Sequence, residues 1–134
     1  MDHILTSAGA LEILQNGVGS APSMLVRLFS NNLTAFTKAT VLSDLTQASF
    51  DGYISASPTW TAPALSSGVA QTVSGTAGFT YTGVSSTVVY GYYLTDSTGT
   101  KFYGGNKFAA AQTLDTVTTM LNMQVTLTEK SEFG

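Results

Sequence analysis

The sequence has no cysteine and only one histidine, His3, which lies beside the N-terminus. The absence of cysteine excludes a disulfide framework, a thiolate metal site and a cysteine nucleophile. A single histidine excludes a metal site built from several imidazoles, and no G-x-S-x-G motif supplies a serine nucleophile for it. We therefore expect no metal site and no cofactor.

Charged residues are also scarce, at 10% of the chain against about 25% in typical soluble domains. Eight acidic and five basic residues give a net charge of −3, and the basic residues form no cluster. Nucleic-acid binding requires several neutralised phosphates, so this distribution argues against DNA or RNA as a partner. No apolar run approaches the roughly 18 residues of a membrane-spanning helix, so we expect no membrane partner.

Four aspartates are the remaining candidates for catalysis: Asp44, Asp51, Asp96 and Asp115. A facing pair could hydrolyse a glycosidic bond. Each also fits a local role, because aspartate caps helical turns and opens tight turns. These local roles account for all four, so we expect that the protein is not an enzyme and keep a carboxylate glycosidase as an alternative.

Residues 24–134 carry the patterns of β-structure. Apolar runs over 24–29 and 88–94 predict core strands, the second covered on both faces, and a tight turn at 96–99 predicts a hairpin that returns through 101–103. Alternation around Phe79 and over 121–128 predicts half-buried strands, whereas 41–50 supports a single helical turn. The expected fold is an all-β antiparallel β-sandwich or jelly roll of about seven to eight strands.

Residues 1–23 differ from this β-rich body. Ser7–Asn16 predict a short helix that ends at Gly17, followed by a small-residue hinge. We expect an N-terminal arm that contacts a neighbouring subunit or capsid protein; a helix packed on the domain's own core is the alternative. The apolar residues of this predicted contact are Ile4, Leu5, Leu11, Ile13 and Leu14.

Aromatic residues permit three interpretations. Tyrosine and tryptophan stack on sugars, pack in cores, and are enriched in protein interfaces. We assign Trp60 and Tyr92 to the predicted subunit or capsid contact. The set considered for a sugar-binding platform is Tyr53, Trp60, Tyr81, Tyr90, Tyr92, Tyr93 and Tyr103.

Three segments and Trp60 resemble a known family. The segments are VRLFSNN (26–32), LSDLTQASFDGY (42–53) and VYGYYLTDSTGT (89–100). Together with Phe108 and the alternating strand near the end of the chain, they look like small virion proteins of tailed bacteriophages, over roughly residues 24–128. These motifs are structural and not catalytic.

The resemblance implies a β-sandwich that coats or cements a capsid, or that sits on the tail. We therefore expect a capsid decoration (cement) protein, made in the host cytoplasm and located on the capsid surface of the virion. Its partners would be the major capsid protein and other copies of itself, as a trimer. A receptor- or glycan-binding module on the tail or a fibre is the alternative.

Serine and threonine replace the missing charges. Thr80, Thr82, Thr126 and Thr128 occupy the polar positions of predicted strands, where threonine favours β-structure. A sheet face with hydroxyls and no charges loses less solvation free energy when another subunit covers it. This composition favours a surface that is packed in an assembly.

Overall fold

The computed structural model describes residues 24–59, 64–66 and 69–129, and over these ranges the chain is all-β with antiparallel sheets, as the sequence predicts. A single 3-10 turn, η1 (Leu42–Asp44), is the helical turn expected within 41–50. The strands are β1 (Leu25–Phe29), β2 (Ala64–Ser66), β3 (Val69–Val73), β4 (Ala77–Thr80), β5 (Thr87–Thr95), β6 (Phe102–Leu114), β7 (Met120–Met123) and β8 (Thr126–Glu129). The predicted N-terminal arm, residues 1–23, lies outside the described residues.

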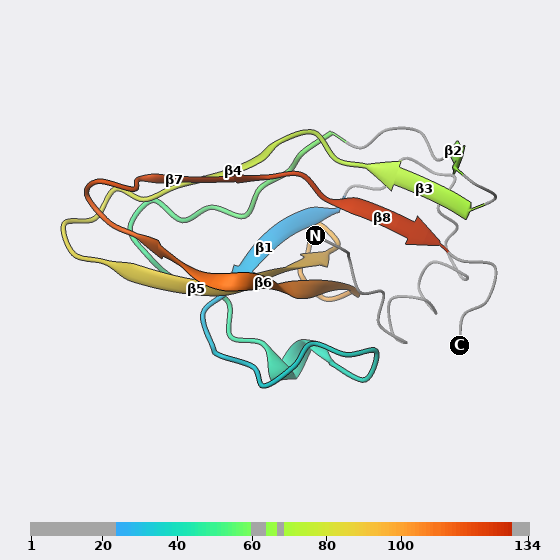
Figure 1. The fold of residues 1–134 in the computed structure, drawn as a ribbon, viewed down its shortest axis with the longest axis horizontal. Coiled ribbons are helices and arrows are strands. Elements are labelled where there is room, and N and C mark those ends of the chain that lie inside the picture. The colour runs from blue at the N-terminus through green and yellow to red at the C-terminus, as the bar shows by residue number, and fades with distance from the viewer. Residues whose placement is uncertain (1–23, 60–63, 67–68, 130–134) are drawn as a thin grey trace.

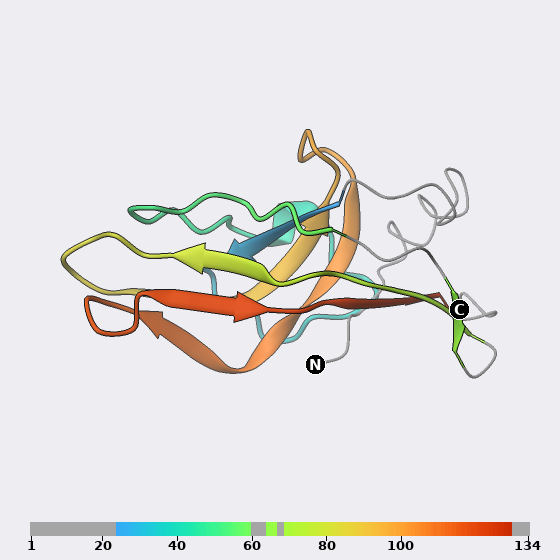
Figure 2. The same ribbon diagram turned by 90° about the horizontal axis from the view of Figure 1, so that it is seen from above.

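The strands lie in two layers that face each other (Figure 1). One layer is the sheet β1-β5-β6, and the other contains β4-β7 and β2-β3-β8. In the second layer β3 leads into β4, and β7 leads into β8, so the two pairs form one long ribbon (Figure 2). The ribbon is joined at Ser74, whose N–H donates to the Val125 carbonyl at 2.8 Å and whose Oγ accepts the Val125 N–H at 2.8 Å.

The main core fills the space between the layers. Strands β1 and β5 supply Val26, Leu28, Tyr92 and Leu94, all at most 1% exposed, and β4 supplies Phe79 at 1%. Strand β5 is the middle strand of its sheet, which explains why its sequence is apolar on both faces, as predicted. The apolar composition of β5 therefore matches its burial on both faces of the sheet.

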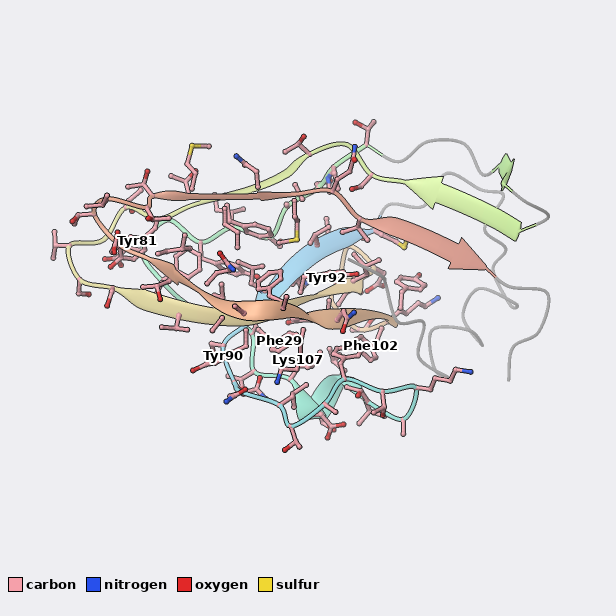
Figure 3. All side chains as sticks on the ribbon, viewed as in Figure 1. Phe29, Tyr81, Tyr90, Tyr92, Phe102 and Lys107 are labelled. Carbon is pink, nitrogen blue, oxygen red and sulfur yellow. The ribbon has the colours of Figure 1, made fainter. Side chains whose placement is uncertain are left out.

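A second, smaller aromatic cluster covers the other side of the β1-β5-β6 sheet. Phe29, Tyr93 and Phe102 from the sheet pack with Phe36, which lies in the segment between β1 and η1. Figure 3 shows Phe29, Phe102 and Lys107 on this side. Because β5 has a core on each side, the sheet is shielded by β4-β7 on one face and by residues 31–47 on the other (Figure 1).

Hydrogen bonds attach this covering segment to the sheet. Lys107 Nζ donates to the Leu33 carbonyl and, at 3.4 Å, to Asn32 Oδ1. The side chain of Asn31 donates to the Asp44 carbonyl at 2.9 Å and accepts the Thr46 N–H at 2.8 Å. The Lys107 bonds thus tie the segment to β6, and the Asn31 bonds tie its two ends together.

The free edge of β1 and the edge of β4 are joined by residues 51–59. Ala56 exchanges two backbone hydrogen bonds with Val26, at 2.8 and 2.9 Å. The carbonyl of Asp51 accepts the Thr82 N–H at 2.8 Å, beyond the end of β4. The same segment thus touches both layers and covers strand edges that would otherwise be open to pairing.

Candidate functional site

The residues that the sequence assigns to a subunit or capsid contact fall into two groups. Six lie outside the described residues: Ile4, Leu5, Leu11, Ile13, Leu14 and Trp60. The seventh, Tyr92, is 1% exposed and lies between the two layers, in the same cluster as Phe79 and Leu94 (Figure 3). The assignment of Tyr92 to a contact surface is therefore wrong, because a partner could reach its ring only by opening the core.

The other described tyrosines also serve the interior. Tyr81 and Tyr93 are 5% and 4% exposed. Tyr53 is half-buried: its ring stacks on Phe79 with centroids 6.0 Å apart, and its hydroxyl accepts the Leu28 N–H at 3.2 Å. Half-buried Tyr90 and Tyr103 pack against the two cores. Among the described residues the tyrosines thus form no exposed platform, which counts against sugar stacking on them.

Burial also changes the acidity of one phenol. The loss of solvation inside the second cluster raises the pKa of Tyr93 to about 12. Arg27 opposes this shift, and its guanidinium Nε donates to Thr95 Oγ1 at 2.8 Å. Tyr93 therefore stays protonated at neutral pH, and its ring packs in the second cluster.

The aspartates make local hydrogen bonds. Asp96 Oδ1 accepts the N–H groups of Thr100 and Lys101 at 2.9 and 3.1 Å, which closes the β5–β6 turn. Asp115 Oδ1 accepts the N–H groups of Val117 and Thr118 at 2.9 and 2.7 Å. The turn and cap roles predicted for Asp96 and Asp115 are confirmed.

The other two aspartates also belong to turns. Asp44 Oδ2 accepts the Val41 N–H at 3.0 Å and caps η1, as predicted. Asp51 precedes Gly52, whose φ of 89° suits a glycine at a tight turn. All four aspartates thus sit in turns or caps: Asp44 and Asp51 between β1 and β2, Asp96 between β5 and β6, and Asp115 between β6 and β7.

These hydrogen bonds favour the ionised form of two carboxyls. Burial opposes ionisation of Asp96, but donors from Lys101, Thr98 and Thr100 outweigh it and lower the pKa of this carboxyl below its ordinary value. Backbone donors from Thr118 and Val117 likewise lower the pKa of Asp115. Neither group has the raised pKa of a general acid, since hydrogen bonds to the charged form favour ionisation.

The described residues lack three further features. They contain no group of three or more histidine, cysteine, aspartate or glutamate side chains that could hold a metal ion. They contain no buried side-chain nitrogen or oxygen without a hydrogen-bond partner. No helix among them is long and apolar enough to cross a membrane.

What the described chain does present is an uncharged sheet surface, here called the outer β4–β7 face. It consists of Gly78, Thr80, Met120 and Asn122, which point away from the core on paired positions. A Cβ placed on Gly78 would lie 2.8 Å from Asn122 Oδ1, so this carboxamide lies over the glycine. The alternation of Phe79 with Thr80 predicted this outward hydroxyl.

Two exposed valines were not predicted as functional. Val84, in the loop between β4 and β5, is 93% exposed, and Val117, in the loop between β6 and β7, is 89% exposed. In the sequence, each valine is a single aliphatic residue inside a hydroxyl-rich turn segment. The segment is GVSS (83–86) for Val84 and DTVTT (115–119) for Val117. Patterns of period two and 3.6 do not detect such residues, because they search for buried faces.

No protein-family model matches the sequence, and no match is found among curated proteins.

Proposed function

We propose that this chain is a structural protein of a bacteriophage particle that decorates or cements the capsid. In this proposal the two layers form an antiparallel β-sandwich, and copies assemble as a homo-oligomer, a trimer, over junctions between major capsid subunits. The observation that carries it is the uncharged outer β4–β7 face, together with three aspartates, Asp44, Asp96 and Asp115, whose carboxylates bond within their own turns. An uncharged sheet face of this kind supports a role in which the chain presents surface to other subunits.

Desolvation explains why an uncharged face suits this role. Covering an ionised side chain costs several kcal/mol unless it finds a partner, whereas covering a hydroxyl or amide costs about 1–3 kcal/mol if it is left without a hydrogen bond and less if it forms one. Thr80 and Asn122 are groups of the second kind. Symmetric copies then multiply weak contacts, since linked binding events raise avidity without any new contact.

Particle composition and imaging test the proposal. We expect virions purified by density gradient to contain the chain in a fixed ratio to the major capsid protein. A particle reconstruction should show two-layered β density over capsid junctions. The mass of the isolated protein in solution should correspond to a trimer.

Other results would contradict the proposal. Absence of the chain from purified virions would refute a virion role altogether. Density on the tail or a fibre would refute capsid decoration and favour the receptor- or glycan-binding alternative. Hydrolysis of a glycan by the purified protein, lost on substitution of two aspartates, would favour the enzyme.

A further inference from the structure

One edge of the second layer has no strand paired to it in the part of the chain that the structure describes. Strands β7 and β8 follow each other along this edge, with β4 and β3 as their only partners, and β6 passes it in the other layer (Figures 1 and 2). From the pair Ala77–Met123 to the pair Val73–Thr126, the β3–β4 side advances four residues and the β7–β8 side three. The extra residue lies on the β3–β4 side, so the edge strand keeps a regular alternation over residues 120–129.

Hydrogen bonds show which backbone groups of this edge face outward. The Thr119 carbonyl accepts the Tyr81 N–H at 2.7 Å, and both backbone groups of Val125 bond to Ser74 at 2.8 Å. Thr119 and Val125 therefore direct these groups inward, and in an antiparallel ladder every second residue directs its groups the other way. The residues with outward-facing N–H and C=O groups are Met120, Asn122, Gln124, Thr126 and Thr128. Within the described ranges, no hydrogen bond uses these groups in the first three of them.

The other strand edges among the described residues are covered, short or irregular. Backbone bonds from residues 47–59 cover β1 and the ends of β4, and β2 has three residues. On β6 the pairing is irregular, because six residues (Lys107–Gln112) stand opposite three of β5 (Val89–Gly91). Proteins protect sheet edges by such devices, or with proline and charge. The β7–β8 edge has none of them, since neither proline nor a charged residue occurs between Asp115 and Glu129.

Burial also indicates a missing neighbour beside β7. Phe79 and Ala77, which point inward from β4, are each 1% exposed. Leu121 and Met123 are their direct partners on β7 and pack against the same core, yet both are only half-buried. A strand beside β7 with apolar side chains on its inward face would remove this remaining apolar surface from water.

We propose that the β7–β8 edge is a contact between two copies of the chain, which pair antiparallel about a two-fold axis at Gln124. This register gives the longest overlap of outward-facing groups, since it places Asn122 opposite Thr126 of the second copy. On the inward face, Met123 then lies opposite Val125 of the second copy, so that apolar positions meet. No like charges face each other, because the paired stretch is uncharged.

The geometry of the edge favours a second copy as its occupant. Outward N–H and C=O groups at strand spacing require an extended chain that offers the same alternation. The edge itself meets this requirement, carries no charge that would repel its copy, and is present at the concentration of the chain. A two-fold contact cannot close a trimer, so this contact is additional to the assembly proposed above and does not depend on a capsid role.

Disulfide formation tests the contact directly, because the chain has no cysteine of its own. In the proposed register position 124 faces its own copy, with Cα atoms about 5.5 Å apart, inside the range of about 4.4–6.8 Å for a disulfide. Asn122 is equally an exposed edge residue but lies four residues from its own copy, about 14 Å along the strand. Under mild oxidation we expect covalent dimers of Gln124→Cys and none of Asn122→Cys. Dimers of both at one rate, the result of random collision, or of neither, overturn the proposal.

Charge and amide exchange provide the second test. Gln124→Lys places two like charges opposite each other and should weaken the two-fold association about fivefold in sedimentation experiments. Thr80→Lys is the matched control, because it adds the same charge to the same face away from the edge, and it should associate as the wild type does.

The amides of Met120, Asn122 and Gln124 should exchange more slowly as the protein concentration rises, since pairing of two copies occupies them. Exchange that is independent of concentration overturns the proposal. Protection of these amides only when capsids are added would assign the edge to the capsid protein, and would likewise overturn the pairing of copies.

Discussion

Gly91 in β5 is predicted to tolerate no side chain, although its backbone is not in the left-handed region. It is paired with Phe29 of β1 on one side and with Lys107 of β6 on the other. A Cβ at this position would lie 2.3 Å from the Asn106 carbonyl oxygen and 2.3 Å from Phe29 Cζ. Real Cβ atoms essentially never approach another heavy atom more closely than 3.0 Å, so relief requires a movement of 0.7 Å (3.0 minus 2.3).

The magnitude follows from which of the two neighbours can move. The Phe29 ring can tilt, but it is fully buried, and the carbonyl belongs to the backbone of β6. Overpacking a core typically costs about 1–3 kcal/mol, and distortion of the β5–β6 pairing weakens hydrogen bonds as well. We expect Gly91→Ala to lower the free energy of unfolding by about 3 kcal/mol, which is a fall of about 10 °C in melting temperature for a chain of this length.

Thermal and urea unfolding, followed by circular dichroism, measure this effect. Gly78→Ala is the matched control, because there the new Cβ meets only Asn122 Oδ1, the end of an exposed side chain. The control should be neutral or slightly stabilising, since alanine restricts the unfolded chain. A melting temperature of Gly91→Ala within about 2 °C of the wild type would refute the reasoning.

A double variant separates the two obstacles at Gly91. Phe29→Leu removes the ring but leaves the Asn106 carbonyl in place. We expect Gly91→Ala with Phe29→Leu to be no more stable than Gly91→Ala alone. A gain in stability would show that the ring, and not strand β6, is the main obstacle.

Three further predictions concern polar groups. Lys107→Met removes the donor to the Leu33 carbonyl and should cost about 1–2 kcal/mol, with faster hydrogen exchange confined to residues 31–47. The pKa of Asp96 is lowered in the folded state, so its contribution to stability is present above the unfolded value of about 3.9 and is lost as the pH falls through the folded value. The stability advantage of the wild type over Asp96→Asn should therefore shrink below about pH 4 in acid-unfolding curves. The pKa of Tyr93 is raised to about 12, so the wild type should lose stability as the pH rises from about 10 towards 12, and Tyr93→Phe should lose less.

Each of these predictions has an outcome that contradicts it. Unchanged exchange over residues 31–47 in Lys107→Met would show that the Lys107 hydrogen bonds do not hold this segment. A constant difference between wild type and Asp96→Asn across the acid range would mean that the turn does not depend on the carboxylate. Equal losses of stability by wild type and Tyr93→Phe between about pH 10 and 12 would contradict the effect assigned to burial of Tyr93.

Local sequence was sufficient for several elements. Strand β5 was predictable because apolar residues occupy both of its faces, which only a doubly covered strand requires. The turn after it was predictable because Asp96 and Gly99 have intrinsic turn chemistry, and Gly99 has a φ of 77°. The alternation of Phe79 with Thr80 predicted the inner and outer surfaces of β4, because successive side chains of a strand point to opposite faces.

Pairing with distant segments divides the alternating stretch at 121–128 into two strands. Its alternation is continuous in sequence, yet the structure divides it into β7 and β8. The division occurs because the partner changes from β4 to β3 at this point, where Ser74 Oγ takes the Val125 N–H. No local signal reports that change of partner.

Strand β6 was predicted only at its start, 101–103, but extends to Leu114. Its small residues carry no alternating pattern, and pairing with β5 supplies the strand conformation, with an irregularity between Val89 and Gly91.

The candidate contact surface shows the same distinction. The sequence by itself determined an all-β, weakly charged chain whose aspartates belong to turns, because these properties depend on composition and on neighbours along the chain. It did not single out Val84, because valine is compatible with a buried or an exposed position, and its assignment of Tyr92 to a contact conflicted with its own prediction that both faces of 88–94 are covered. The tertiary structure decided both: the register of β5 turns Tyr92 between the layers, and two inter-layer loops bring Val84 and Val117 to one end of the molecule.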